Sequence, residues 1–305
     1  MKYKILGGSN TKFSEIGLGT WKFNPNLEEA SKTAKYMFEN GVNFLDTAEM
    51  YQNESRLGIM LKEMKIEDEP FIATKVSPNN LHYNDIIRSC NESLSKLGVK
   101  QITLYQIHWP NHRINIRETI NAMEHLVEEG KIRYIGVSNF DQKELEEALS
   151  YLKSYKIVSN QVEYSVAFNE IENSGLMDFC NKNKISIIAY SPIGRGMVEN
   201  YKYLYNELHE IGIKYNATAL QVALKYIISN KNVIAIPKVS SIEHAKEILG
   251  TEKFDISKSD INRIKDIADK IKKPLAGKIL NKILKANGCW SGIMERHERL
   301  RMERD

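Results

Sequence analysis

Residues 71–108 read FIATKVSPNNLHYNDIIRSCNESLSKLGVKQITLYQIH. Two short apolar runs, FIATK (71–75) and LYQIH (104–108), flank a stretch with helical spacing that ends on Gly98. Short runs rich in Ile, Phe and Tyr that lack clean alternation are typical of strands buried on both faces. A glycine in the left-handed conformation commonly ends a helix. The segment therefore predicts a strand, a helix and a second strand parallel to the first.

The same unit repeats along the chain. The further apolar runs are IGLG ending at Gly19, FLD (44–46), YIGVS (134–138), VSNQ (158–161), ISIIAY (185–190) and VIAIP (233–237). Stretches with helical spacing lie between them at 27–41, 120–130 and 219–230. Eight strands that alternate with helices close a β/α barrel, which usually takes ~250 residues. We therefore predict an α/β fold, a (β/α)8 TIM barrel with an N-terminal β-hairpin within Met1 to Ser14 and extra C-terminal helical segments.

A doubly wound open sheet is the main structural alternative. Such a sheet would normally carry the nucleotide-binding pattern G-x-G-x-x-G after its first strand. The pattern does not occur in the chain, which favours the barrel. The length of 305 residues would also suit two average domains.

The charge is concentrated at the C-terminus. The whole chain carries a net charge of +4, and residues 272–305 hold nine Lys or Arg against four Asp or Glu, which gives +5 and leaves −1 for the rest. So small a charge disfavours nucleic-acid binding. We predict a barrel domain over 1–271 and a basic, helical tail over 272–305, packed on the barrel or partly exposed.

Three cysteines, Cys90, Cys180 and Cys289, are far apart and odd in number. This argues against a disulfide framework or a zinc cluster and fits a reducing compartment. The chain shows neither the apolar segment of a signal peptide nor the ~20 apolar residues that span a bilayer. We therefore expect a cytoplasmic protein without a metal or stable membrane insertion, either a monomer or a homo-oligomer.

Polar residues stand where the predicted strands end. They are Asp46, Lys75, His108, Ser138, Gln161 and Tyr190, with Tyr51 in the loop after the second strand. Each alone fits an ordinary structural role, such as a helix cap for Asp46. Asp, Lys and His are costly to bury unless they pair, so their occurrence on three adjacent strands favours one shared site. In a β/α barrel that site lies at the C-terminal ends of the strands.

Eight segments resemble, in chain order, the motif series of the aldo-keto reductases. They are GLGTW (17–21), FLDTAEMYQNE (44–54), ATK (73–75), IHWP (107–110), GVSNF (136–140), NQVEYS (160–165), AYSPIGRG (189–196) and IPK (236–238). The resemblance covers about residues 1–270. It implies a β/α barrel that binds a nicotinamide cofactor, usually NADPH, and reduces aldehydes and ketones.

The resemblance implies a catalytic tetrad of Tyr51, Asp46, Lys75 and His108. Hydride delivered to a carbonyl carbon leaves negative charge on the oxygen, which then needs a proton. A free tyrosine, with a pKa of ~10, is a poor acid at neutral pH, and a nearby ammonium lowers that pKa. We expect Tyr51 to be the general acid, Lys75 to supply the charge, Asp46 to keep Lys75 charged, and His108 to orient the carbonyl.

The resemblance also implies cofactor contacts. Ser138, Asn139 and Gln161 would hold the nicotinamide amide, and Tyr190 would stack on the ring. The turn that would follow the pyrophosphate contains Ser191, Pro192, Gly194, Arg195 and Gly196.

At the adenosine end, Lys238 matches the family's contact to the 2′-phosphate, and Glu247 stands at the family's acidic position. The family often has Arg and Asn where this chain has His244 and Ile248. A lysine lacks the guanidinium fork, so we expect NADPH, with NADH as an alternative.

Trp21, Met50 and Trp109 match positions that line the family's substrate pocket, whose apolar walls would suit a small-molecule carbonyl substrate. A non-catalytic redox sensor or regulatory subunit on the same barrel is the alternative function, and the basic tail is the feature that favours it. A phosphate-binding barrel isomerase is a weaker third reading, because the Asp-Tyr-Lys-His set suits that chemistry poorly.

Overall fold

The computed structural model describes residues 1–23, 26–64, 69–194 and 201–271. Within them, eight parallel strands form one sheet whose order follows the chain. The strands are β3 (Leu18–Gly19), β4 (Phe44–Asp46), β5 (Phe71–Val76), β6 (Ile102–Ile107), β7 (Ile132–Ser138), β8 (Ile157–Glu163), β9 (Ser186–Tyr190) and β10 (Val233–Ile236). Each coincides with one of the eight predicted runs, so the alternation expected from the sequence is confirmed.

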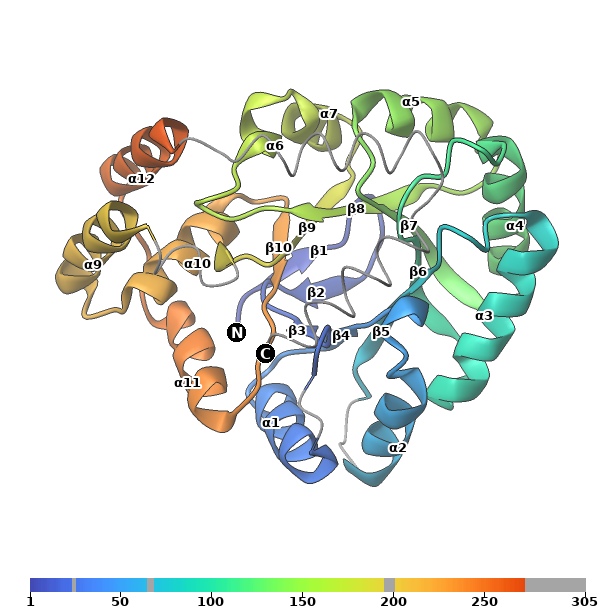
Figure 1. Cartoon of the computed structure of the whole chain (residues 1–305), viewed down its shortest axis with the longest axis horizontal. Helices are drawn as coiled ribbons and strands as arrows, with labels where there is room; N and C mark the ends of the chain where they lie inside the picture. Colours follow the sequence, from blue (N-terminus) through green and yellow to red (C-terminus); the bar gives the residue numbers. More distant parts are fainter. Residues whose placement is uncertain (24–25, 65–68, 195–200, 272–305) are drawn as a thin grey trace.

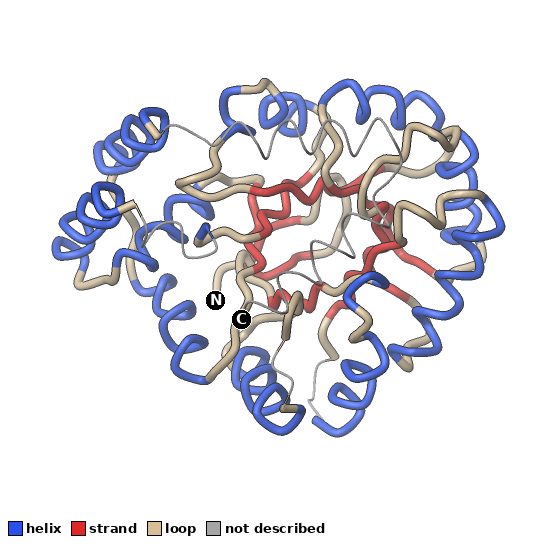
Figure 2. The backbone as a smooth tube through the Cα atoms, viewed as in Figure 1, coloured by secondary structure: helices blue, strands red, loops and turns tan. Residues whose placement is uncertain are grey.

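Backbone hydrogen bonds join the first strand to the last and close the sheet. The N–H of Gly17 donates to the carbonyl of Ala235 at 2.8 Å, and the N–H of Gly19 donates to that of Pro237 at 3.0 Å. Gly19 suits this seam because a Cβ there would lie 2.7 Å from the carbonyl oxygen of Ile236. The strands accordingly form a ring in Figure 2. The structure is the predicted barrel rather than a doubly wound open sheet.

Helices surround the ring on its outside (Figure 1). They are α1 (Leu27–Glu39), α2 (Glu54–Met64), α3 (Tyr83–Leu97), α4 (Ile116–Glu128), α5 (Gln142–Tyr151), α6 (Glu170–Asn173), α7 (Leu176–Lys182), α9 (Lys202–Tyr215), α10 (Ala219–Ser229), α11 (Ile242–Gly250) and α12 (Lys258–Lys270), with 3₁₀ turns η1 (Glu49–Tyr51) and η3 (Thr251–Lys253).

Local signals in the sequence set where these helices begin and end. Gly98 follows α3 in the left-handed conformation, with φ 69°, as the sequence predicted. Asp141 begins α5, and its carboxylate accepts from the N–H of Glu144 at 2.9 Å. The Glu144 carboxylate in turn accepts from the N–H of Asp141 at 2.7 Å. This reciprocal cap satisfies two backbone donors that the first helical turn leaves unpaired.

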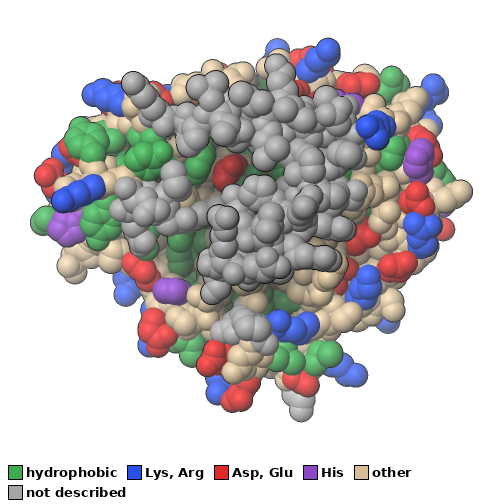
Figure 3. Space-filling view, in the orientation of Figure 1, with side chains coloured by type: hydrophobic (Ala, Val, Ile, Leu, Met, Phe, Trp, Pro, Cys, Tyr) green, Lys and Arg blue, Asp and Glu red, His purple; other side chains and the backbone are tan. Residues whose placement is uncertain are grey.

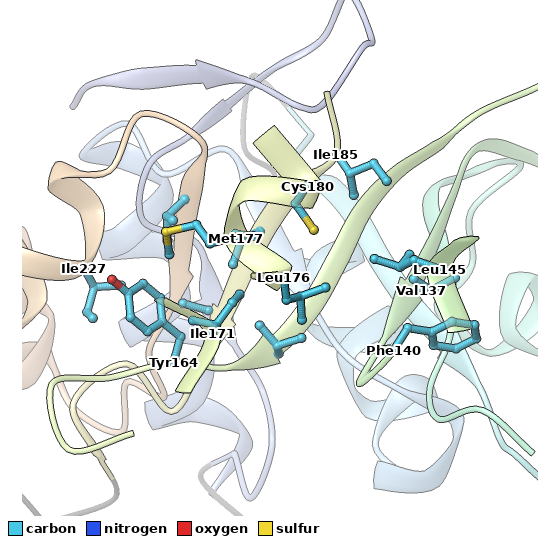
Figure 4. Close-up of a cluster of buried hydrophobic side chains, with 14 of the residues drawn as sticks. Val137, Phe140, Leu145, Tyr164, Ile171, Leu176, Met177, Cys180, Ile185 and Ile227 are labelled. Carbon is cyan, nitrogen blue, oxygen red and sulfur yellow. The ribbon is translucent and has the colours of Figure 1, made fainter. Parts of the chain in front are cut away.

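The main hydrophobic core lies between the ring of strands and the helices. Figure 4 shows one part of it, where Leu176, Met177 and Cys180 of α7 lie among apolar side chains from neighbouring segments. Both described cysteines, Cys90 and Cys180, are free and buried. Burial raises the pKa of each thiol to about 12, so these thiols are unreactive packing groups.

A hairpin closes the N-terminal end of the barrel. Strands β1 (Tyr3–Ile5) and β2 (Lys12–Ser14) pair antiparallel, as predicted. The fully buried ring of Phe13 lies 4.7 Å from that of Phe44 and 5.2 Å from that of Phe71, measured between centroids. Phe44 and Phe71 begin their strands, so the hairpin fills this end and leaves the opposite end for a site.

Two predictions concern the outside of the molecule. The predicted helical tail over 272–305 lies outside the described residues, as does its expected packing. In the part of the chain that the structure describes, no helix combines the length and apolar character that crossing a membrane requires. Exposed apolar side chains gather on the left of Figure 3, over α9. The exposed large apolar residues of α9 are Tyr203, Tyr205 and Ile213.

Candidate active site

Asp46 and Lys75 form a buried ion pair at the C-terminal ends of β4 and β5. The Lys75 Nζ donates to Asp46 Oδ1 at 2.6 Å and to the backbone carbonyl of Thr47 at 2.8 Å. The side chain of Lys75 is 0% exposed, and that of Asp46 is 2% exposed. Burial lowers the pKa of Lys75, and the Asp46 carboxylate opposes this by favouring the ammonium. The carboxylate therefore offsets part of the cost of burying the cation.

Tyr51 and His108 lie next to this pair. Tyr51 ends the 3₁₀ turn η1, and the Lys75 Nζ lies 5.0 Å from the centroid of its ring. The rings of Tyr51 and His108 have their centroids 5.6 Å apart at 79°, an edge-to-face arrangement. Lys75 thus lies close to both the carboxylate of Asp46 and the ring of Tyr51. The structure brings all four residues of the predicted tetrad together.

The surroundings of His108 favour its neutral form. It follows β6 by one residue, rather than ending the strand as predicted, and is 8% exposed. Its backbone N–H donates to the carbonyl of Val76 at 3.1 Å, which continues the pairing with β5. Burial lowers the pKa of His108 well below its usual value, and the charge of Lys75 lowers it further. Its Nδ1 has no hydrogen-bond partner among the described residues.

The turn that carries Tyr51 is tied to its surroundings by two side chains that sequence reasoning missed. Glu49 accepts from the N–H of Ser77 at 2.8 Å and from the Asn80 amide at 2.7 Å. Asn53 accepts from the Thr47 hydroxyl at 2.7 Å and donates to the carbonyl of Thr20 at 2.9 Å. These contacts fix the position of Tyr51 relative to the strand ends.

A second polar group lies at the ends of β7, β8 and β9. The Ser138 hydroxyl donates to the backbone carbonyl of Gln161 at 2.9 Å. The Asn139 amide donates to Ser138 Oγ at 2.9 Å and to the carbonyl of His108 at 3.0 Å. The Tyr190 hydroxyl donates to Asn139 Oδ1 at 3.1 Å. The predicted nicotinamide contacts are therefore contiguous with one another and linked to His108.

Gln161 also joins this group to the ion pair. Its side-chain amide donates to Asp46 Oδ2 at 2.8 Å. Gln106 of β6 donates to the same oxygen at 3.2 Å. Sequence reasoning missed Gln106, although a polar residue within the apolar run LYQIH was a signal that could have found it. A buried amide in such a strand needs a partner inside the barrel.

The chain makes a tight turn after β9. Ser191 and Gly194 have positive φ values of 50° and 73°, and the N–H of Gly194 donates to the carbonyl of Ser191 at 2.8 Å. Pro192 between them is buried. The predicted contacts Arg195 and Gly196 lie outside the described residues.

The residues predicted for the adenosine end lie near the seam of the barrel. Lys238 is exposed and pairs with Gly19 through a parallel bridge. The carboxylate of Glu247, on α11, accepts from the hydroxyl of Thr218 at 2.8 Å. Nδ1 of His244 lies 2.9 Å from Ser240 Oγ. Thr218 is the residue that caps the N-terminus of α10, so one carboxylate oxygen of Glu247 already has a structural partner.

The predicted pocket residues follow the ends of three strands. Trp21 follows β3, Met50 lies in η1, and Trp109 follows His108. Trp109 is buried, at 8% exposed, and the other two are half-buried. Among the described residues, no group of three or more His, Cys, Asp or Glu could hold a metal ion.

Comparisons with known proteins show the family of the chain. The sequence model of the Aldo/keto reductase family matches residues 15–269. A glyoxal reductase of Bacillus subtilis (strain 168) is 35% identical over 253 residues, covering 82% of this chain and 87% of the relative. A methylglyoxal reductase of Escherichia coli (strain K12) is 30% identical, covering 86% and 93%.

Solved structures agree as well. A thermostable aldo-keto reductase in complex with the inhibitor epalrestat is 36% identical and superposes with a TM-score of 0.83, covering 88% of this chain and all of that one. An aldo-keto reductase from Klebsiella pneumoniae in complex with NADPH is 28% identical, with a TM-score of 0.79 and coverage of 88% and 96%.

Proposed function

The chain belongs to the aldo/keto reductase family, and from this premise we propose that it is an oxidoreductase that reduces aldehydes and ketones to alcohols with NADPH. The observation that carries the proposal is the buried Lys75–Asp46 pair, whose ammonium lies 5.0 Å from the centre of the Tyr51 ring. That arrangement suits a proton donor at neutral pH. The NADPH complex of a structural neighbour supports the choice of cofactor.

The four residues of the tetrad divide the proton chemistry. When bound, NADPH supplies the hydride that reaches the carbonyl carbon. Tyr51 donates its hydroxyl proton to the carbonyl oxygen as negative charge develops there. Lys75 stabilises the phenolate that remains, and Asp46 keeps Lys75 charged despite its burial. His108, neutral because its pKa is lowered, orients the carbonyl through a ring N–H.

The second polar group fits a nicotinamide. A carboxamide needs both donors and acceptors, and Ser138, Asn139 and Gln161 offer them at adjacent strand ends. Tyr190 supplies a flat face for stacking. We assign the rest of the cofactor to the turn and the seam: Ser191, Pro192, Gly194, Arg195, Gly196, Lys238 and Glu247. NADH remains an alternative cofactor, because a lysine holds a phosphate as a point charge.

We propose small dicarbonyl compounds as one substrate class. Two relatives are named for glyoxal and methylglyoxal. Trp21, Met50 and Trp109 would give the entrance apolar walls, which accept such molecules without selecting strongly by shape. We place the protein in the cytosol, as a monomer or homo-oligomer, and its buried free thiols fit that setting.

The test is NADPH oxidation, followed by absorbance, with methylglyoxal and with an aromatic aldehyde. The wild type should turn over, and Tyr51→Phe should lose ~10²-fold or more in kcat, because only the proton donor is removed. Its affinity for NADPH, measured by fluorescence, should be retained. A Tyr51→Phe variant with nearly native turnover would remove Tyr51 from the proton step.

The same assay separates the enzyme from the regulatory-subunit alternative. That alternative depends on residues 272–305, which lie outside the described residues. Tight binding of NADPH by the wild type, with no turnover of any carbonyl, would favour it over the reductase.

A further inference from the structure

Gln106 is a buried polar side chain with no role in the mechanism above. It lies on β6, opposite Lys75 of β5 and Gly136 of β7, and is 0% exposed. A fully buried amide is retained in a core when its hydrogen bonds are satisfied. The partners of Gln106 therefore indicate what it does.

Asp46 is one of these partners, and each of its two carboxylate oxygens accepts from different donors. Oδ1 accepts from Lys75 at 2.6 Å. Oδ2 accepts from the amide of Gln106 at 3.2 Å and from the amide of Gln161 at 2.8 Å. The Gln161 amide also lies 3.3 Å from Gln106 Oε1, its second acceptor. The two amides thus hold the Asp46 carboxylate in the orientation that places one oxygen against Lys75.

The neighbouring strand leaves room for this side chain. A Cβ at Gly136 would lie 2.8 Å from Gln106 Cγ and 2.7 Å from Ser159 Oγ. Any other residue at 136 would require Gln106, Ser159 or Leu104 to shift. The glycine is a second observation, independent of the hydrogen bonds, that the barrel accommodates Gln106 in this position.

We propose that Gln106 is a positioning residue for proton donation by Tyr51. The Gln106 amide stabilises the ionised Asp46 carboxylate and its orientation. The ionised carboxylate keeps Lys75 charged beside Tyr51. Gln106 also contacts Gln161, which lies on the cofactor side of the Asp46–Lys75 pair. The inference rests on the proposed function. Donors to a carboxylate favour its ionised form, and an ionised partner favours the ammonium.

The other groups near Lys75 are Tyr51, His108 and the buried Glu54, which accepts from Thr74 at 2.7 Å.

The sign of the pH effect follows from this chain of contacts. Without the Gln106 amide, the ionised Asp46–Lys75 pair is less favoured, so Lys75 stabilises the phenolate of Tyr51 less. The pKa of Tyr51 then rises. Reduction needs the protonated phenol, so the alkaline limb of the kcat profile moves to higher pH, while the weaker acid lowers kcat.

The first variant is Gln106→Met, which keeps the side-chain volume and removes the amide. We expect kcat to fall about tenfold, KM for the carbonyl to stay within about twofold, and the alkaline limb to move up by about half a pH unit or more. Gln106→Asn, a shorter amide, should lie between Met and the wild type. The matched control is Ser159→Ala, which borders the same space and whose hydroxyl has no hydrogen-bond partner among the described residues.

A second readout does not need turnover. The ¹⁵N signal of the Lys75 ammonium, assigned by its absence in Lys75→Met, is titrated in each variant. Gln106→Met and Gln106→Asn should lower the pH at which Lys75 loses its proton, and Ser159→Ala should not. An unchanged Lys75 titration, or a native pH profile in both Gln106 variants, overturns the proposal. If the wild type turns over no carbonyl while the Lys75 titration shifts, the proposed function fails and the role of Gln106 on the ion pair stands.

Discussion

Each end of the barrel holds a lysine beside a carboxylate, and the two lysines have different surroundings: Lys75 is fully buried, whereas Lys4 is partly buried. At the C-terminal end, Lys75 contacts Asp46, one backbone carbonyl and the ring of Tyr51. At the N-terminal end, Lys4 of the hairpin lies 3.4 Å from Glu15 and donates to the carbonyls of Ile228, Asn230 and Val233.

The difference shows that a buried or partly buried ion pair does not by itself mark an active site. Lys4 is surrounded by backbone carbonyls at the end of α10 and the start of β10, so its ammonium joins the hairpin to the barrel. Lys75 has one such carbonyl, and another side of its ammonium faces a phenol. Burial lowers the pKa of both lysines, so the pKa does not distinguish them. The two lysines are distinguished by their positions in the barrel and by the aromatic neighbour of Lys75.

Lys75→Met gives the largest effect that this comparison predicts. Removing the cation takes away the support for the Tyr51 phenolate and leaves Asp46 without its charge partner, so kcat should fall about 10³-fold. The affinity for NADPH, measured by fluorescence, should change much less. A variant that keeps more than a tenth of the native kcat would show that Lys75 is as structural as Lys4.

Lys4→Met should have the opposite profile. It breaks a partly buried pair and leaves three backbone carbonyls without their donor, which should cost about 3 kcal/mol of unfolding free energy. The fraction that stays folded should keep kcat within about twofold of the wild type, because the hairpin lies at the far end of the barrel. Urea unfolding measures the first quantity and steady-state kinetics the second. A large loss of kcat in the folded variant would contradict the separation of the two ends.

Lys238→Met extends the comparison to an exposed lysine at the seam. If Lys238 contacts the 2′-phosphate, its loss should weaken NADPH about tenfold, as expected for one charge-assisted hydrogen bond, and leave NADH nearly unchanged. Fluorescence titration with each cofactor measures the two affinities. Lys246→Met, another exposed lysine on α11, is the control and should change neither. Equal losses for both cofactors would remove Lys238 from the phosphate site.

The sequence predicted the fold because the fold depends on local pattern and on strand order, whereas the tetrad was implied by the resemblance to the family. Eight apolar runs gave the barrel, and the barrel brought Asp46, Lys75 and His108 to one end. Gln106 and Lys4 were missed because their partners are distant in the chain. Gln106 is 60 positions from Asp46 and 55 from Gln161, and Lys4 reaches carbonyls more than 220 positions away. No single-sequence periodicity encodes such hydrogen bonds, and only closure of the barrel creates them.

His108 affects the pH dependence of stability. Burial and Lys75 hold its pKa well below the usual value in the folded protein, whereas the unfolded chain binds a proton near ~6.5. The unfolded state therefore binds more protons below that pH, so His108 lowers stability as pH falls, by up to about 1.4 kcal/mol per pH unit. His108→Gln should remove this contribution and flatten the urea-unfolding free energy between pH 6.5 and 5 relative to the wild type. An unchanged slope would mean that His108 is charged in the folded protein, and a charged imidazole would compete with Lys75 for the position beside Tyr51.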